Sequence, residues 1–216
     1  MSTEPDLELF LEKLFKLPEG EFPTNADFDQ YRRNWGFTIY RTFYGPNSDE
    51  QWRKLLEKIT KGAKYELNMM EDLDVQEPTV AFTKAWNLFR LDARSDPSTL
   101  DGLTLENVRQ LYLDGTGGQP MNVDIDPWRV FLLADEAVLA SPELSVINVV
   151  DADYDPVRAA ITNPRVGPQR YFGWITMSPS CILILWKALD IYLLSSLGSG
   201  PDTTGGPGGF WDADSF

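Results

Sequence analysis

Three aspartates alternate with other residues in the second half of the chain, at Asp151, Asp153 and Asp155. This spacing opens the calcium loop of EF-hand proteins, in which carboxylates at positions 1, 3 and 5 bind the ion. The remainder of that loop is missing, because Pro156 replaces the turn glycine and Thr162 replaces the bidentate glutamate. A weaker magnesium site with two carboxylate ligands and a solvated strand end are the two remaining interpretations. The solvated strand end is simpler in so acidic a chain, so we predict no metal ligand.

The chain contains no histidine and a single cysteine. Catalysis by Ser-His-Asp or Cys-His groups is therefore excluded in its usual form, as are histidine-ligated zinc and iron. Acid–base chemistry near pH 7 would need a carboxylate, Lys, Tyr or Cys with a perturbed pKa. Cys181 falls near the start of a predicted helix, where a thiol pKa is lowered. A buried, inert cysteine is the simpler interpretation, and we predict no cofactor.

Arg41 lies on the apolar face of a predicted strand. A buried guanidinium requires a carboxylate or a bound anion. The candidates for an internal partner lie near the ends of predicted strands: Asp135, Glu136, Asp151 and Asp153. An internal ion pair is the simpler interpretation. The functional alternative is an anion clamp in an aromatic-walled pocket, with ligand-binding residues Tyr40, Arg41, Tyr44, Asp151, Asp153 and Trp174.

A glycine-rich stretch, DGTGGQP at 114–120, suggests a phosphate-binding loop at first sight. It lacks the GK[ST] ending, and no helix start follows that would aim backbone amides at a phosphate. We predict a flexible surface loop.

The net charge of −14 argues against binding to nucleic acid or anionic membranes, both of which require clustered Lys and Arg. A local basic pocket is still compatible with this charge, and Arg32, Arg33 and Arg41 are its candidates. The first residues lack the features of a signal peptide. The longest apolar run, at 182–194, is too short and too interrupted to span a bilayer. These features, with the single cysteine, predict a cytoplasmic protein.

The element that must position Arg41 is the clearest in the chain. Residues 35–44 alternate aromatic and β-branched side chains with other residues, which predicts a strand. Gly45 and Pro46 end it, and a helix follows from Ser48, with Gln51 completing a capping box. The apolar stripe of that helix has helical spacing and consists of Trp52, Leu55, Leu56 and Ile59. We expect the helix to end near Gly62.

Further elements follow from the same periodicities. Helices are predicted at 6–17, from 78 to near 92, after Thr104, and at 179–197; strands are predicted at 128–134, 145–152 and 170–177. The short connections between the last three strands favour an α+β fold with a mostly antiparallel four-stranded sheet and helices on one face, ferredoxin-like or a related sandwich. The predicted organisation is an N-terminal helix and loop at 1–28, one α+β domain at 29–197, and a flexible Gly/Pro-rich tail at 198–216. The simplest role for the aromatic end of that tail is disorder or docking on its own domain.

Four segments resemble one family. They are WGFTIYRTFYGPNSDEQWRKLLEKI, FRLDARSDPSTLDGLTLENVRQLY, WRVFLLADEAVL and YFGWITMS. Together they resemble an uncharacterised family of proteins from filamentous ascomycete fungi, over about residues 29 to 190. The resemblance implies an intracellular fungal protein of one domain, and it implies no activity and no site residues.

Two functions fit these observations. The first is a non-catalytic binding or interaction module with an aromatic-lined pocket for a small molecule or a protein partner. The second is a cofactor-independent enzyme, such as a cyclase, isomerase or lyase, acting on an apolar small molecule. The second requires a deep cavity with a carboxylate of raised pKa. The absence of a catalytic signature favours the binding module.

Overall fold

The computed structural model of this chain describes residues 6–16, 28–71, 77–141, 143–160, 169–204 and 206–213. Most of the loop predicted within residues 1–28 and the last residues of the predicted tail, 214–216, lie outside the described residues.

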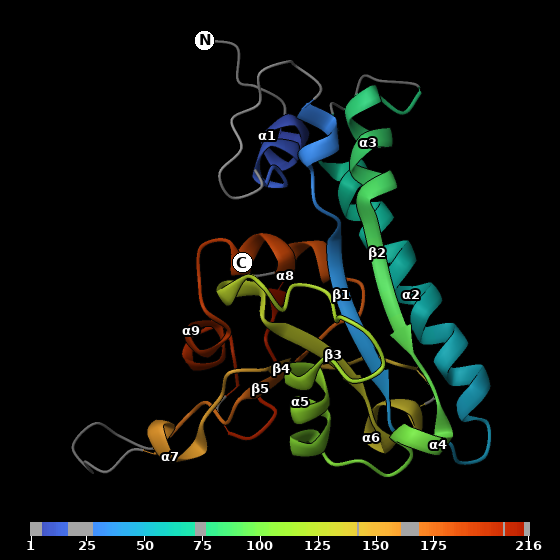
Figure 1. Cartoon of the computed structure of the whole chain (residues 1–216), viewed down its shortest axis with the longest axis vertical. Helices are drawn as coiled ribbons and strands as arrows, with labels where there is room; N and C mark the ends of the chain where they lie inside the picture. The colour runs from blue at the N-terminus through green and yellow to red at the C-terminus, as the bar shows by residue number, and fades with distance from the viewer. Residues whose placement is uncertain are drawn as a thin grey trace.

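Within the described ranges, five strands form one open mixed sheet with the order β2-β1-β3-β4-β5 (Figure 1). Strand β1 is parallel to both of its neighbours, β2 and β3, whereas β3–β4 and β4–β5 are antiparallel. The strands are β1 (Trp35–Arg41), β2 (Phe89–Arg94), β3 (Val130–Ala134), β4 (Ile147–Asp151) and β5 (Trp174–Met177). The α+β class is thus confirmed. The sheet has five strands rather than four, and only half of its neighbouring pairs are antiparallel.

Strand β2 was not predicted from the sequence, because the helix predicted from residue 78 to near 92 included its first residues. Helix α3 (Val80–Leu88) ends earlier, and Phe89 already has an extended backbone. Phe89 has the spacing of the helical apolar stripe, but it is apolar because its ring packs against Trp35, with 4.7 Å between the two ring centroids. After it, Arg90, Asp92 and Arg94 alternate with less polar residues, as expected for an edge strand that keeps charges on one side.

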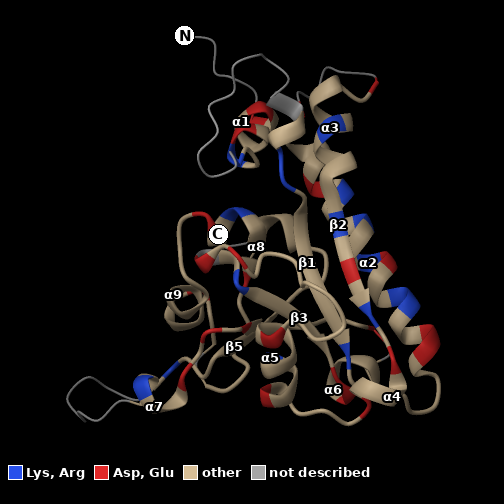
Figure 2. Ribbon diagram, viewed as in Figure 1, with Lys and Arg blue, Asp and Glu red and all other residues tan. Residues whose placement is uncertain are grey.

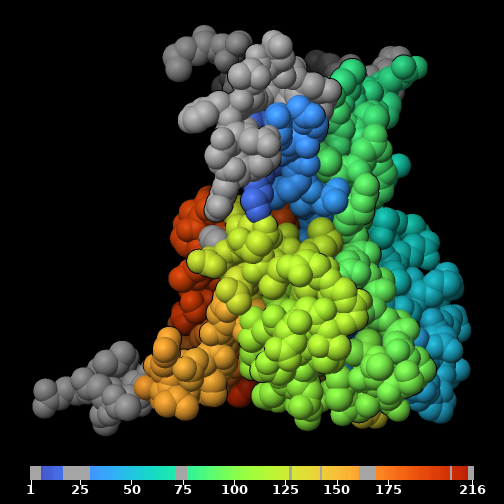
Figure 3. All heavy atoms as spheres, in the orientation of Figure 1, coloured from blue at the N-terminus to red at the C-terminus, as the bar shows by residue number. Residues whose placement is uncertain are grey.

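Helices cover both faces of the sheet, so the expectation of a single covered face was wrong. Alternate residues of β1 face opposite layers, because strand side chains have a period of two. Trp35 and Ile39 pack with α2 (Ser48–Met69), α8 (Ile182–Leu189) and the predicted N-terminal helix, α1 (Asp6–Lys13). Tyr40 packs on the other side with α5 (Leu105–Asp114), whose atoms lie on the face shown in Figure 3. The remaining helices are α4 (Pro97–Leu100), α6 (Glu136–Leu139), α7 (Pro156–Ala159) and α9 (Leu194–Ser199), with short 3₁₀ turns η1 (Phe28–Tyr31) and η2 (Asp126–Trp128).

Helix α2 runs past Gly62, where we expected it to end. Its apolar stripe continues through Ala63 and Leu67, which are buried. Gly62 serves close packing instead, because a Cβ there would lie 2.4 Å from the Cα atom of Ser180. The apolar helix predicted at 179–197 is interrupted and forms α8 and α9. Cys181 is buried at the start of α8. No helix among the described residues combines the length and apolar character that crossing a membrane requires.

The described part of the tail lies against β5. The Thr176 amide donates to the Gly209 carbonyl at 3.0 Å, and the Trp211 amide donates to the Thr176 carbonyl at 2.8 Å. The Trp211 side chain is 1% exposed and belongs to the same core layer as α8. The tail therefore covers the edge of β5, which would otherwise present unpaired backbone groups.

We predict that Gly36→Ala destabilises the protein by about 3 kcal/mol, through a backbone clash and an unfavourable positive φ. Gly36 has φ 121°, and a Cβ there would lie 1.9 Å from the Arg90 carbonyl oxygen of β2. Urea unfolding measures the effect. Gly102→Ala is the matched control, because Gly102 also has positive φ (69°) but no atom within 4 Å of the added Cβ. Equal losses in the two variants would contradict the clash.

A second prediction concerns the tail. Trp211→Ala should lower the free energy of unfolding by about 3–5 kcal/mol, as for other buried tryptophans. Phe210→Ala, at a 37% exposed neighbour, should cost less than about 1 kcal/mol. Chemical unfolding of both variants provides the comparison, and a small loss for Trp211→Ala would mean that the tail does not dock.

Candidate functional site

The strand order creates a topological switch point. The connection from β1 through α2 to β2 crosses one face of the sheet, and the connection from β2 through α5 to β3 crosses the other. Ligands of open α/β sheets bind outside the carboxyl ends of strands at such a point. The carboxyl ends of β1 and β3 are therefore the first place to search for a site.

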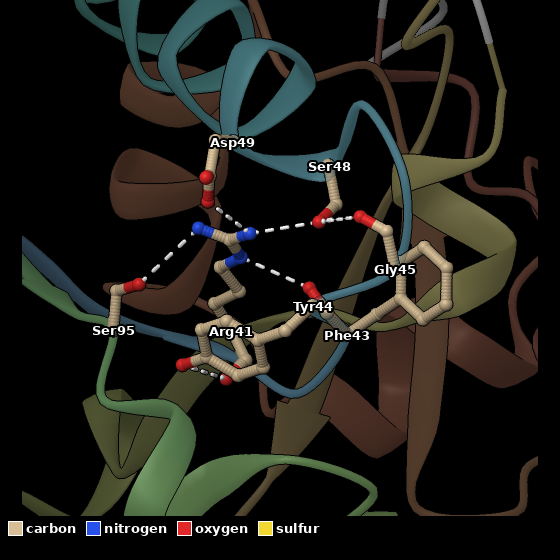
Figure 4. Close-up of polar contacts among 7 residues, drawn as sticks. All are labelled: Arg41, Phe43, Tyr44, Gly45, Ser48, Asp49 and Ser95. Atoms are coloured by element: carbon tan, nitrogen blue, oxygen red, sulfur yellow. Dashed lines mark hydrogen bonds and ion pairs between the residues drawn. The ribbon is translucent and has the colours of Figure 1, made fainter.

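Arg41 fills this position (Figure 4). Its side chain is 4% exposed. Its Nε donates to the Phe43 carbonyl at 2.9 Å, and its Nη2 donates to Ser48 Oγ at 2.8 Å and to Asp49 Oδ1 at 2.6 Å. The guanidinium also lies 4.3 Å above the centre of the Tyr44 ring. The network joins the end of β1 to the start of α2, and it occupies the switch point with the protein's own side chains.

The start of α2 differs from the predicted capping box. Asn47 is the cap residue, in a left-handed conformation with φ 62°, and its side chain makes no capping hydrogen bond. Ser48 instead donates to the Gly45 carbonyl at 2.6 Å while accepting from Arg41. The Ser48 hydroxyl therefore accepts from the buried Arg41 guanidinium and does not cap the helix.

The internal partner of Arg41 is Asp49, and none of the four predicted candidates fills this role. Strand β4 is antiparallel to β3, so Asp151 pairs with Val130 at the opposite end of the sheet from Arg41. Asp135 caps α6, accepting from the Val138 amide at 3.0 Å. Arg41 pairs instead with the helix that follows its own strand, because Asp49 lies in the first turn of α2.

The six predicted ligand-binding residues do not form one pocket. Tyr44 joins Arg41, donating through its hydroxyl to the Arg41 carbonyl at 3.1 Å. Tyr40 faces the other layer, against Phe131, and Arg94 donates to its hydroxyl at 3.3 Å. Trp174 lies on edge strand β5, covered by the tail at Gly208.

Asp151 and Asp153 lie together at the far end of the sheet. The carboxylate of Asp151 accepts from the Tyr171 hydroxyl at 3.0 Å and from the Asp153 amide at 2.9 Å. Burial raises the pKa of the Asp151 carboxyl above its ordinary value. Asp153 pairs with Arg129 at 3.0 Å, and Asp155 caps α7. Among the described residues, no three acidic or cysteine side chains are grouped so as to hold a metal ion.

A groove of about 470 Å³ opens at the amino end of β1, beside β2. Seven of its ten lining residues are polar or charged, and three are apolar. The lining residues are Lys16, Arg33, Asn34, Arg90, Leu91, Asp92, Met121, Asn122, Asp124 and Ile125.

Arg33 is the unusual group in this groove. Its guanidinium lies 4.3 Å above the Trp128 ring, which itself stacks on Trp186. Its Nε is buried and has no hydrogen-bond partner in the described structure. Burial lowers the pKa of the Arg33 guanidinium, opposed by the negative charges of Asp124 and Asp190. The group nevertheless remains a cation, since arginine does not deprotonate in proteins.

The two carboxylates and the lysine of the groove are already paired. Lys16 forms an ion pair with Asp124. Asp92 accepts from Arg94 Nε at 2.9 Å and from Thr38 Oγ1 at 2.8 Å. Arg90 donates to the backbone carbonyl of Asn87 at 2.8 Å. In the part of the chain that is described, Arg33 and Arg90 therefore lack a carboxylate at ion-pair distance, and the groove has an excess of positive charge.

Asn122 gives the groove a fixed polar wall. It is 8% exposed and takes a left-handed conformation with φ 64°. Its Nδ2 donates to the Gly36 carbonyl at 2.8 Å, which fixes the orientation of the side-chain amide. The same loop is held by the Met121 amide, which donates to Thr38 Oγ1 at 2.9 Å.

Sequence reasoning found this site only in part. Arg33 was named with Arg32 and Arg41 as a candidate basic pocket, but the structure separates the three. Arg32 lines a different depression with Leu11, Glu12 and Phe15. Arg90 and Asn122 carried no signal, because β2 was not recognised and the 121–125 loop has no periodicity.

Comparison of this chain with family models, with curated proteins and with solved structures finds no match.

The buried carboxyl of Asp151 yields a pH prediction. Because its pKa is raised on folding, the folded state binds the proton more tightly than the unfolded chain. Stability due to this group is then greatest at low pH and falls as pH rises above the unfolded value of about 3.9. The free energy of unfolding of Asp151→Asn, relative to that of the wild type, should therefore be more favourable at pH 7 than at pH 4. The difference is about 1.4 kcal/mol for each tenfold increase in proton affinity of Asp151 on folding.

Unfolding by urea between pH 4 and pH 7 measures this difference. Asp101→Asn removes the same charge from an exposed position and controls for net charge. A loss of stability in Asp151→Asn that is the same at both pH values would contradict the prediction, because it would show that only the hydrogen bonds of Asp151 matter.

Proposed function

We propose that this chain is a non-catalytic binding module that takes a small anionic ligand, bearing a carboxylate or a phosphate, in the groove at the amino end of β1. The observation that carries this proposal is Arg33, a cation held over Trp128 with a buried Nε that has no partner among the described residues. A bound anion would give the guanidinium a counter-charge, which no described carboxylate supplies at ion-pair distance. Arginine suits the task, since its planar fork matches carboxylate and phosphate oxygens.

The charge balance supports an anion rather than a cation. The two carboxylates of the groove, Asp92 and Asp124, are neutralised by Arg94 and Lys16. Arg33 and Arg90 are then the groups with unmet charge. A ligand anion would meet both without displacing an internal ion pair.

The shape of the groove supports a ligand with a short apolar body. Its volume of about 470 Å³ falls within the range of small-molecule pockets. Leu91, Met121 and Ile125 supply apolar wall. The described residues that line the groove include no aromatic side chain, so the aromatic lining expected of the pocket is not found there. Trp128 instead lies beneath the Arg33 guanidinium and supports it.

The alternative function, a cofactor-independent enzyme, needs a cavity beside a carboxylate of raised pKa. Asp151 has the raised pKa, but Tyr171 and the Asp153 amide engage its oxygens. The cavities described here are lined by other residues. The binding module is therefore the better supported of the two functions.

The proposed setting is cytoplasmic, with no nucleic acid and no membrane among the partners, as the net charge of −14 favours. Membership of the ascomycete family and a ferredoxin-like arrangement of the sheet both stay predictions. The proposed function depends on neither, because it rests on the lining of one groove.

The test is thermal unfolding with phosphate, acetate, benzoate and phenyl phosphate, each against chloride at equal ionic strength. A ligand at a hundredfold excess over its Kd stabilises by about 2.7 kcal/mol, which raises Tm by roughly 5–10 °C for a chain of this size. We expect a shift with at least one aromatic anion. The carboxylate and phosphate arms identify its chemistry.

Variants locate the effect. Arg33→Gln and Arg90→Gln should each abolish the shift, and Arg33→Lys should retain only part of it, because lysine lacks the planar fork. Arg158→Gln is the matched control, at a side chain that is 89% exposed and far along the chain from the groove. Equal shifts in all variants, or none in the wild type, would refute the proposed function.

A further inference from the structure

A stripe of exposed and half-buried side chains runs along one outward face of α2. Lys54, Lys58, Lys61, Tyr65 and Met69 follow one another at intervals of three or four residues, so they share a helix face. The stripe covers roughly 22 Å at 1.5 Å per residue. Its first part is basic and its last part is apolar, with Tyr65 61% and Met69 56% exposed. Figure 2 shows the basic residues of α2 along the outer side of the molecule.

A second groove, of about 430 Å³, follows this stripe. It is lined by Lys54, Glu57, Lys58, Lys61, Gly62, Tyr65 and Ser180. The close approach of Gly62 to Ser180 forms its floor. Lys58 crosses to the neighbouring loop, where its Nζ donates to the Leu144 carbonyl at 2.9 Å. The stripe is thus one wall of a concave surface rather than an isolated helix face.

The charge of this groove is opposite to that of the chain. Three lysines and one glutamate line it, in a protein of net charge −14. Lys54 pairs with Glu50 and Lys61 pairs with Glu57, both at 2.7 Å. Exposed pairs of this i,i+4 kind contribute little to stability. A carboxylate from a partner can therefore replace them at little cost.

We propose that this surface docks an acidic peptide segment of a partner protein. Carboxylates of the peptide would meet Lys54 and Lys61, and an apolar side chain beyond them would pack on Tyr65 and Met69. The order of charge and apolar area along α2 sets the order expected in the peptide. A polyanion such as duplex DNA fits less well, because it would extend past the groove over an acidic surface.

The test uses a fluorescent peptide of four glutamates followed by Leu-Leu-Phe, titrated with the full chain and followed by anisotropy. We expect saturable binding that weakens with salt and is lost when glutamines replace the glutamates. Lys54→Glu/Lys61→Glu should raise Kd by roughly tenfold or more, through lost contacts and like-charge repulsion. Tyr65→Ala, which leaves the charges and the fold in place, should weaken binding of the same peptide.

The matched control is Lys13→Glu/Arg158→Glu, which reverses the same number of exposed charges on other helices, α1 and α7, and should bind as the wild type does. Arg33→Gln should also bind normally, because the two grooves are separate. Three results would overturn the proposal: no binding by the wild type, equal binding of the glutamine peptide, or tighter binding of a DNA duplex than of the peptide.

Discussion

The structure depends on the complete burial of β1. This strand has neighbours on both edges and helical layers on both faces, and each of its seven residues is buried. Every polar group that it carries must then find a partner within the protein, because an unsatisfied buried group costs about 1–3 kcal/mol. Thr38 meets this demand with Asp92 and with the Met121 amide, and the Gly36 carbonyl meets it with Asn122. Burial of one strand thus fixes the position of the 121–125 loop.

The two ends of β1 meet the same demand differently. At the carboxyl end, Arg41 has four acceptors from the turn, from α2 and from the β2–α4 connection. The usual ligand position of an α/β sheet is consequently closed. At the amino end, Arg33 is supported by an aromatic ring and not by a carboxylate at ion-pair distance within the described chain. A cation that is positioned but incompletely satisfied is the more suitable of the two for binding an external anion.

Sequence periodicity predicted the elements that bury one clear face. The alternation at 35–44 and the stripe from Trp52 to Ile59 gave β1 and the first part of α2, and β3, β4 and β5 lie within their predicted ranges. Edge strand β2 was missed because its charged residues weaken the period. The site was harder to predict, since Arg41 ends β1 whereas Arg33 lies two residues before its start, a span of roughly 26 Å for an extended chain at 3.3 Å per residue. Their closeness in sequence gave no indication of this separation, and the parallel β2 that brings Arg90 to the groove had not been recognised.

For the two proposed ligands, the uneven distribution of charge explains how so acidic a chain could select small or narrow anions. At physiological ionic strength the Debye length is about 8 Å, so the charge of distant carboxylates is largely screened at either groove. A small anion, or the acidic part of a peptide, is then governed by the few cations that it contacts. A long polyanion spans many Debye lengths and extends beyond the groove over a chain of net charge −14, so its repulsion grows with its length. The same net charge that argues against nucleic acid therefore sharpens selection for a ligand that fits within one groove.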